Sequence, residues 1–328
     1  MTTSERQTSE RQTSELTMLP APAALAKFVP GERLTATARP ANSFREELRR
    51  IPNLRNALAV ASLYVETIGI VVAAVWIDNL FVWALAFVLM GRELARFAAL
   101  MHEAAHRLLF RNRRVNDWVG RWLLGFPSFT PVDLYRRGHM AHHRDEFGPD
   151  EPDIPLYRGY PIARASMRRK LTRDAEGRTG WKLFKGLLRG VRADDATVRS
   201  QARLIVGTQI VLIAIGVASG HPWVYFILWL APYLTVWRVI NRLRSIAEHG
   251  GMQRSKDRRL TTHTVRQLPL ARLFVVPHHI GWHLAHHVDS GIPMANLPKL
   301  HAELRRTGYV TDELEYPSYL ALWKQLTR

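Results

Sequence analysis

The chain has 328 residues, no cysteine and a formal net charge of +18, which comes from 46 lysines and arginines against 28 aspartates and glutamates. Without cysteine there are no disulfides, cysteine-ligated zinc sites, iron–sulfur clusters or thiol nucleophiles, so any metal site has to use histidine and oxygen ligands. An excess of basic residues on this scale predicts an anionic partner, either a nucleic acid or a membrane surface.

The first 45 residues are polar and include the repeat SERQTSERQTSE and a stretch rich in proline and alanine. A segment of this composition has little apolar surface to bury when it folds. Residues 1–45 are therefore predicted to form a disordered tail.

Four apolar runs follow the tail, and they come in two pairs. Ala57–Ile77 is followed after two residues by a run that begins at Leu80, and Leu204–Ser219 is followed after three residues by a run that begins at Trp223. A helix needs about 20 apolar residues to cross the hydrocarbon core of a bilayer, and fewer where flanking side chains reach the interface.

Residues 46–328 are therefore predicted to form one all-α, multi-pass membrane domain with four transmembrane helices in two hairpins. The expected spans are about 57–77, 80–101, 203–219 and 222–240. The alternative is a water-soluble protein in which the four helices form the core.

Charged residues are distributed unevenly around these runs. The expected hairpin tips, residues 78–79 and 219–222, contain no lysine or arginine, whereas the segments between and after the hairpins are rich in both. By the positive-inside rule, both termini and the segments 102–202 and 241–328 lie in the cytoplasm, where they form a helical cap on the membrane. We expect a bacterial plasma membrane, and no nucleic acid partner, because topology already accounts for the basic residues.

Histidines are concentrated on the expected cytoplasmic side, in three boxes that read HEAAH, HMAHH and HLAHH, and at one isolated position in AEHGG. These motifs contain His102, His106, His139, His142, His143, His249, His283, His286 and His287. Residues three and four apart share a face of a helix, so each box can present its imidazoles to one side. Two copies of H-x-x-H-H are not expected by chance in a chain with 14 histidines.

Nine imidazoles exceed the capacity of one ion, so the cap is predicted to hold two metal ions with four or five ligands each. Imidazole suits iron, zinc, copper or nickel, and the absence of cysteine disfavours a structural zinc. The alternative is that these are ordinary exposed or buried histidines without a metal.

At these residues the chain resembles the integral-membrane fatty acid desaturase and hydroxylase family. The resemblance covers roughly residues 57–310, and it includes the two apolar hairpins, the three boxes, RSIAEHGG from Arg244 and HLAHHVDSGIPMANLPKLH from His283. It implies a non-haem di-iron centre that activates dioxygen and abstracts hydrogen from an unactivated acyl methylene, with the nine histidines as iron ligands. Many members have glutamate in place of Ala285 and asparagine near His279, so His279 is left open as a further ligand, an orienting group or a bystander.

Acidic side chains can orient metal-binding imidazoles by accepting a hydrogen bond from the second ring nitrogen. The acidic residues near the boxes are Glu103, Asp145, Asp150, Asp153, Glu248 and Asp289. We expect the orienting role for Glu103, Glu248 and Asp289, and surface positions for the others. Tyr135 and Trp282 are candidates to line an acyl tunnel, with simple packing as the alternative.

The expected function is that of an acyl-lipid, acyl-CoA or acyl-carrier desaturase that uses two iron ions, dioxygen and two external electrons to introduce a C=C bond. The chain contains no G-x-G-x-x-G loop for a flavin or nucleotide, so the electrons are expected from an acidic ferredoxin or from a small cytochrome with its reductase.

Three other functions remain open. A lipid or carotenoid hydroxylase or ketolase of the same family would share the first hydrogen abstraction. HEAAH also satisfies the H-E-x-x-H motif of zinc proteases, although a protease would leave both H-x-x-H-H boxes unexplained. The third alternative is a metal-storing or metal-sensing membrane protein without enzymatic activity.

Overall fold

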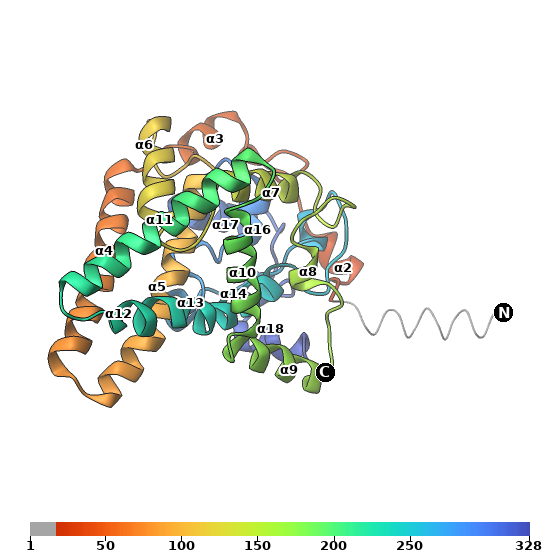
Figure 1. Cartoon of the computed structure of the whole chain (residues 1–328). Helices are drawn as coiled ribbons and strands as arrows, with labels where there is room; N and C mark the ends of the chain where they lie inside the picture. The colour runs from red at the N-terminus through yellow and green to blue at the C-terminus, as the bar shows by residue number, and fades with distance from the viewer. Residues whose placement is uncertain (1–17) are drawn as a thin grey trace.

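The computed structural model describes residues 18–328, which fold mostly into helices (Figure 1). Residues 1–17, the first part of the expected tail, lie outside the described residues.

The prediction of a disordered tail as far as residue 45 does not fit residues 18–45. This segment forms the short helix α2 (Pro22–Leu25) and the beginning of α3 (Asn42–Leu48). Met18 and Leu34 are buried in an apolar cluster with residues from the C-terminal half of the chain. Their partners are distant in sequence, so the local composition did not reveal this packing.

Helices α4 (Asn53–Ile77) and α5 (Leu80–Ala105) form a hairpin, as the first pair of apolar runs predicts. Asp78 ends α4 in the left-handed conformation, with φ of +44°, and the side chain of Asn79 accepts a hydrogen bond from the N–H of Phe81 at the start of α5. Asp and Asn tolerate the left-handed region and cap helix N-termini, so the chain reverses within two residues.

The second pair of apolar runs forms a long helix and a segmented return. The helices are α11 (Ala196–Ala218), α12 (Trp223–Tyr225), the π-helical stretch η2 (Phe226–Leu230), α13 (Ala231–Leu234) and α14 (Val236–His249). Pro232 lacks an amide hydrogen and cannot complete a regular α-helical ladder, which accounts for an irregularity at this point.

Within residues 18–328, three helical stretches are long and apolar enough to cross a membrane, namely Asn42–Ile77, Ala196–Ala218 and Trp223–His249. The second expected span, α5, is long enough but is not one of the three. It carries Arg92, Glu93 and Arg96, which form ion pairs with one another and with Glu66 of α4. These charges lie against the neighbouring helix, so they leave the outer face of α5 apolar.

Large apolar side chains cover the outer faces of α4, α5 and α11. Trp76 and Phe81 are 86% and 82% exposed, and Val65 and Ile210 are exposed in the same way. A continuous apolar surface of this kind is unfavourable in water and marks contact with lipid or protein.

Short helices connect and follow the two hairpins. Between them lie α6 (Arg113–Trp118), the π-helical η1 (Val119–Gly125), α7 (Val132–Arg144), α8 (Ile154–Tyr157), α9 (Arg164–Ala175) and α10 (Arg178–Gly190). After α14 come η3 (Arg258–Leu260), β1 (Thr264–Val265), α15 (Pro269–Phe274), η4 (Pro277–His279), α16 (His283–Val288), η5 (Met294–Asn296), α17 (Leu297–Arg306), β2 (Glu315–Tyr316) and α18 (Tyr319–Gln325). Strands β1 and β2 pair in parallel.

Two apolar clusters form the core. One, which includes Phe97 and Leu228, lies among α4, α5, η1 and η2. The other, which includes Ile246, Leu284 and Leu300, lies among the end of α14 and helices α16, α17 and α18. Because α5 and α14 contribute side chains to both clusters, the C-terminal ends of these two helices lie where the clusters meet.

Candidate metal centre

Four helices supply the nine predicted histidines. HEAAH lies at the C-terminal end of α5, HMAHH on α7 and HLAHH on α16, and His249 is the last residue of α14. The last box starts 181 positions after the first, at His283 and His102, yet the two helix ends and the two short helices meet at one place.

The first group contains His102, His106, His139, His143 and His286, and one ring nitrogen from each lies within 4.8 Å of the others. The Nε2 atoms of His102 and His139 are 2.8 Å apart, those of His139 and His143 are 3.1 Å apart, and those of His143 and His286 are 3.0 Å apart. All three boxes therefore contribute to this group.

The second group contains His142, His249 and His287, whose ring nitrogens also lie within 4.8 Å of one another. His283 belongs beside them, because its Nε2 is 3.0 Å from Nε2 of both His249 and His287. The structure thus brings all nine predicted residues into two adjacent groups of five and four.

Both groups fit a metal ion by the chemistry of their donor atoms. A neutral imidazole nitrogen carries either one proton or one lone pair, so hydrogen bonds alone cannot join every member of a group. Nε2 of His106 is buried without a hydrogen-bond partner among the described residues. A cation at the centre of each group would satisfy all of these lone pairs, and an all-imidazole site suits iron, zinc, copper or nickel.

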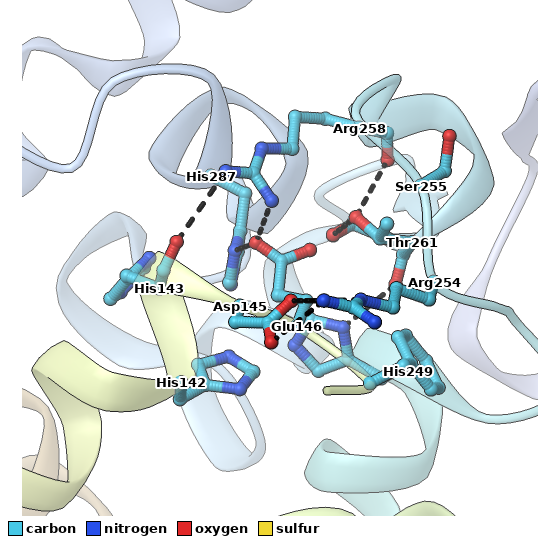
Figure 2. A network of polar contacts seen from close by, with 12 residues as sticks. His142, His143, Asp145, Glu146, His249, Arg254, Ser255, Arg258, Thr261 and His287 are labelled. Atoms are coloured by element: carbon cyan, nitrogen blue, oxygen red, sulfur yellow. Dashed lines mark hydrogen bonds and ion pairs between the residues drawn. The ribbon is translucent and has the colours of Figure 1, made fainter. Parts of the chain in front are cut away.

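The second group is held from outside by acceptors on Nδ1, as Figure 2 shows for His287. Nδ1 of His287 lies 2.6 Å from the Glu146 carboxylate, Nδ1 of His142 lies 2.5 Å from Glu151, and Nδ1 of His249 lies 2.8 Å from the carbonyl oxygen of Thr261. An acceptor on Nδ1 fixes the tautomer with the proton there, which leaves the Nε2 lone pair free for a metal.

Burial favours the neutral form of these imidazoles. It lowers the pKa of His139, His143, His286 and His287 well below the usual value, and the neighbouring histidines lower it further. For His142, burial is the largest influence and acts in the same direction. The hydrogen bond to Glu151 and the charges of Glu151, Asp153 and Glu146 together outweigh it and raise the pKa. A neutral imidazole is the form that binds a metal.

Of the three acidic residues expected to orient imidazoles, only Glu248 is placed beside one. Its Oε1 is 3.6 Å from Nδ1 of His283, and it also accepts a 2.7 Å hydrogen bond from Arg244. Glu103 accepts a hydrogen bond from the backbone N–H of Met294. Asp289 forms an ion pair with Arg45.

His279 lies outside both groups. Its Nε2 is 2.9 Å from the guanidinium of Arg55, and no potential metal group among the described residues includes it. Nε2 of the neighbouring His278 is buried and has no hydrogen-bond partner among residues 18–328. Both His278 and His279 have positive φ angles.

Sequence reasoning missed Glu146 and Glu151 as orienting residues. Both are buried, and Glu151 also accepts hydrogen bonds from the Tyr157 hydroxyl and the Phe147 N–H. The acidic run RDEFGPDEPD after the second box was a usable signal. Which of its carboxylates turn inward depends on the loop after α7, and there Asp145 instead pairs with Arg254 at the surface (Figure 2).

Comparison with known proteins gives consistent matches. The family model described as "Fatty acid desaturase" matches residues 80–316. The chain is 24% identical over 278 residues to dihydrorhizobitoxine desaturase of Bradyrhizobium elkanii, with 78% of each chain covered. It is also 24% identical over 295 residues to an sn-1 oleoyl-lipid 12-desaturase of Anabaena variabilis, covering 80% of this chain and 81% of the relative. A shorter match, 38% over 64 residues, links it to the sn-1 oleoyl-lipid 12-desaturase of Arthrospira platensis.

The family match covers more than half of the chain and all nine clustered histidines, whose boxes the resemblance had singled out. The chain therefore belongs to the fatty acid desaturase family and is an oxidoreductase, a desaturase.

Proposed function

We propose that the protein is a membrane-bound desaturase that holds two iron ions and uses dioxygen and two external electrons to introduce a C=C bond into an acyl chain. The observation that carries this proposal is the convergence of nine imidazoles from four helices into two adjacent groups within a chain of this family. Bound iron would activate dioxygen, the oxidant that removes hydrogen from an unactivated methylene, and zinc could not do so because it has no redox chemistry.

The residues of the chain would bind and orient the two ions. The first group supplies five nitrogen ligands and the second supplies four. Glu146 and Glu151 hold His287 and His142 of the second group in position by hydrogen bonds. Glu248 lies 3.6 Å from His283.

The proposed membrane arrangement has four spans, with α5 as the second. The Glu66, Arg92, Glu93 and Arg96 charges are paired with one another, which lowers the cost of placing them in a bilayer. Both termini and the metal centre would then lie on the cytoplasmic side of a plasma membrane, where the basic residues are concentrated.

An electron donor would dock beside the second group. A cavity of about 550 Å³ opens next to Glu146, and its basic residues are Arg39, Arg144, Arg254, Lys256 and Arg258. Arg258 pairs with Glu146, which in turn contacts His287 (Figure 2), so the path from this surface to the second group is short. An acidic donor such as a ferredoxin fits the charge of the cavity.

Lipid and metal analysis tests the main proposal. Purified protein should contain about two iron ions per chain, and expressing cells should contain acyl chains that have lost two hydrogens. His286→Ala should lose iron and activity while still inserting into the membrane, whereas His221→Ala, at the tip between α11 and α12, should retain both. Addition of an oxygen atom to the acyl chain would instead identify a hydroxylase.

The donor surface and the protease alternative have their own tests. Lys256→Glu should raise the KM for an acidic donor and make that KM less dependent on salt. Lys182 is exposed on α10, away from this cavity, and Lys182→Glu should change neither quantity. In a zinc protease, Glu103→Gln would abolish peptide cleavage and His286→Ala would have little effect. If Lys256→Glu leaves donor kinetics unchanged, the docking site lies elsewhere.

A further inference from the structure

A cavity of about 410 Å³ lies among α5, α7, α10, α11, α13 and α14. Its walls are largely apolar, with Leu183 and Leu187 of α10 on one side and Val198 of α11 beside them. α10 itself exposes Trp181 and Leu188 on the side away from the cavity, as expected for a helix that lies in the membrane interface.

One end of the cavity lies close to the first histidine group. Met101, which lines it, directly precedes His102. Tyr135 also lines it, and the Tyr135 ring stacks on the His139 ring with 5.2 Å between centroids and 15° between planes. No histidine lines the cavity, so a molecule in it would be separated from His139 by the Tyr135 ring.

An arginine without an acidic partner lies in the cavity wall. α14 carries three arginines, Arg238, Arg242 and Arg244. Arg242 is paired with Asp174 and Arg244 is paired with Glu248. Arg238 lines the cavity, and no carboxylate among the described residues lies within ion-pair distance of it. Nε of Arg238 donates to a backbone carbonyl oxygen, and its guanidinium carbon lies 4.2 Å from the centroid of the Tyr233 ring.

A partly buried guanidinium with unused N–H donors is a strong site for a carboxylate or a phosphate, because charge-assisted hydrogen bonds are short and favourable where water is scarce. The lining also contains Thr130 and Asn241, which can add neutral hydrogen bonds to the same head group. A second arginine of the lining, Arg244, is already paired with Glu248. The apolar walls suit an acyl chain.

We infer that this cavity binds the substrate by an anionic head group, a carboxylate or a phosphate ester, which Arg238 recognises while the acyl chain runs past Tyr135 to the histidine groups. The inference rests on the proposed function, since it takes the histidine groups to be the reacting centre.

Ligand binding without turnover tests this assignment. Displacement of a fluorescent fatty acid from the intact purified protein is measured without dioxygen and without an electron donor, so no product forms. The displacing probes have the same twelve-carbon hydrocarbon tail and differ in the head group. They are dodecanoic acid, dodecyl phosphate, methyl dodecanoate and dodecylamine. The variants are Arg238→Gln, Arg238→Lys and Arg238→Glu, with Arg189→Gln, an exposed arginine on α10 outside the cavity lining, as the matched control.

Wild type should prefer at least one of the two anions over the neutral ester by about tenfold or more. Arg238→Gln should remove that preference, Arg238→Lys should keep part of it, Arg238→Glu should shift it to the amine, and Arg189→Gln should not change it. Preference for dodecanoic acid would identify the natural ligand as a free fatty acid, and preference for dodecyl phosphate would identify it as a phosphate-bearing lipid. Equal binding of acid, phosphate and ester by wild type, or an unchanged preference in Arg238→Gln and Arg238→Glu, would overturn the inference.

The same measurement separates this inference from the proposed function. If the protein lacks iron or forms no double bond but still shows an Arg238-dependent anion preference, the cavity assignment stands and the proposed reaction fails. If it desaturates acyl chains while binding acid and ester equally, the reaction stands and the role of Arg238 fails.

Discussion

Replacement of Glu146 by glutamine tests the support of the second histidine group most directly. Glu146 is buried, its carboxylate lies 2.6 Å from Nδ1 of His287, and it also pairs with Arg258. Glutamine keeps the size and one acceptor oxygen but removes the negative charge, so the hydrogen bond to His287 is no longer charge-assisted and Arg258 loses its counter-ion.

Loss of such an outer partner typically lowers metal affinity 10- to 100-fold, which corresponds to about 1.4 to 2.7 kcal/mol. We expect the upper part of this range for Glu146→Gln, because one substitution affects both His287 and Arg258. Of the two histidine groups, His287 contributes to the second, although its ring also lies close to His143 of the first group. Chelator treatment should therefore remove about half of the iron from the variant under conditions in which wild type retains nearly all of it.

Iron per chain is measured after graded exposure to a chelator, with circular dichroism as a check that the helices remain. Asp145→Asn is the matched control, because Asp145 is the preceding residue but pairs with Arg254 at the surface. It should behave like wild type. Iron retention by Glu146→Gln equal to that of wild type, or equal losses in Glu146→Gln and Asp145→Asn, would refute the orienting role.

Three further predictions concern stability and topology. Burial lowers the pKa of His263 to about 4. Below the usual pKa of about 6.5, the unfolded chain therefore binds a proton that the folded chain does not. His263 should reduce the free energy of unfolding by about 2 kcal/mol between pH 7 and pH 5, and His263→Gln should remove that part of the pH dependence of the denaturant midpoint. Gly180→Ala should lower the melting temperature, because a Cβ there would lie 2.2 Å from a backbone oxygen of α13, whereas Gly186→Ala on the same helix meets nothing within 4 Å and should be neutral or stabilising. Because the chain has no cysteine, single-cysteine variants can map the membrane topology. Ser219→Cys should react with an impermeant maleimide added outside intact cells, whereas Ala165→Cys should react only after lysis. The reverse pattern would contradict the proposed orientation.

Local sequence patterns were sufficient for several features of the fold. The apolar runs separated by Asp78 and Asn79 predict the α4–α5 hairpin, because those two residues end one helix and begin the next by their own side chains and backbone preferences. The packed segment after residue 17 was not predictable in this way. Met18 is buried only because distant parts of the chain supply its apolar neighbours.

The carboxylates around the histidines were likewise only partly predictable from the local sequence. The acidic run after the second box indicates that acceptors are available, but the direction of each side chain depends on how the chain turns after α7. Glu146 and Glu151 turn inward and contact His287 and His142, whereas Asp145 turns outward. No periodicity holds in such a loop, so spacing in the sequence gives no basis for choosing among them.

The sequence by itself determined which residues are available to bind metal, because spacings of three and four place imidazoles on one face of a helix regardless of the rest of the fold. Only the tertiary structure decided how these imidazoles are shared. His142 and His143 are adjacent in the chain but belong to different groups, and on α16 His286 joins the first group while His287 joins the second. Successive residues on a helix point about 100° apart, so neighbours in one box face different sites once α7 and α16 are packed against the ends of α5 and α14.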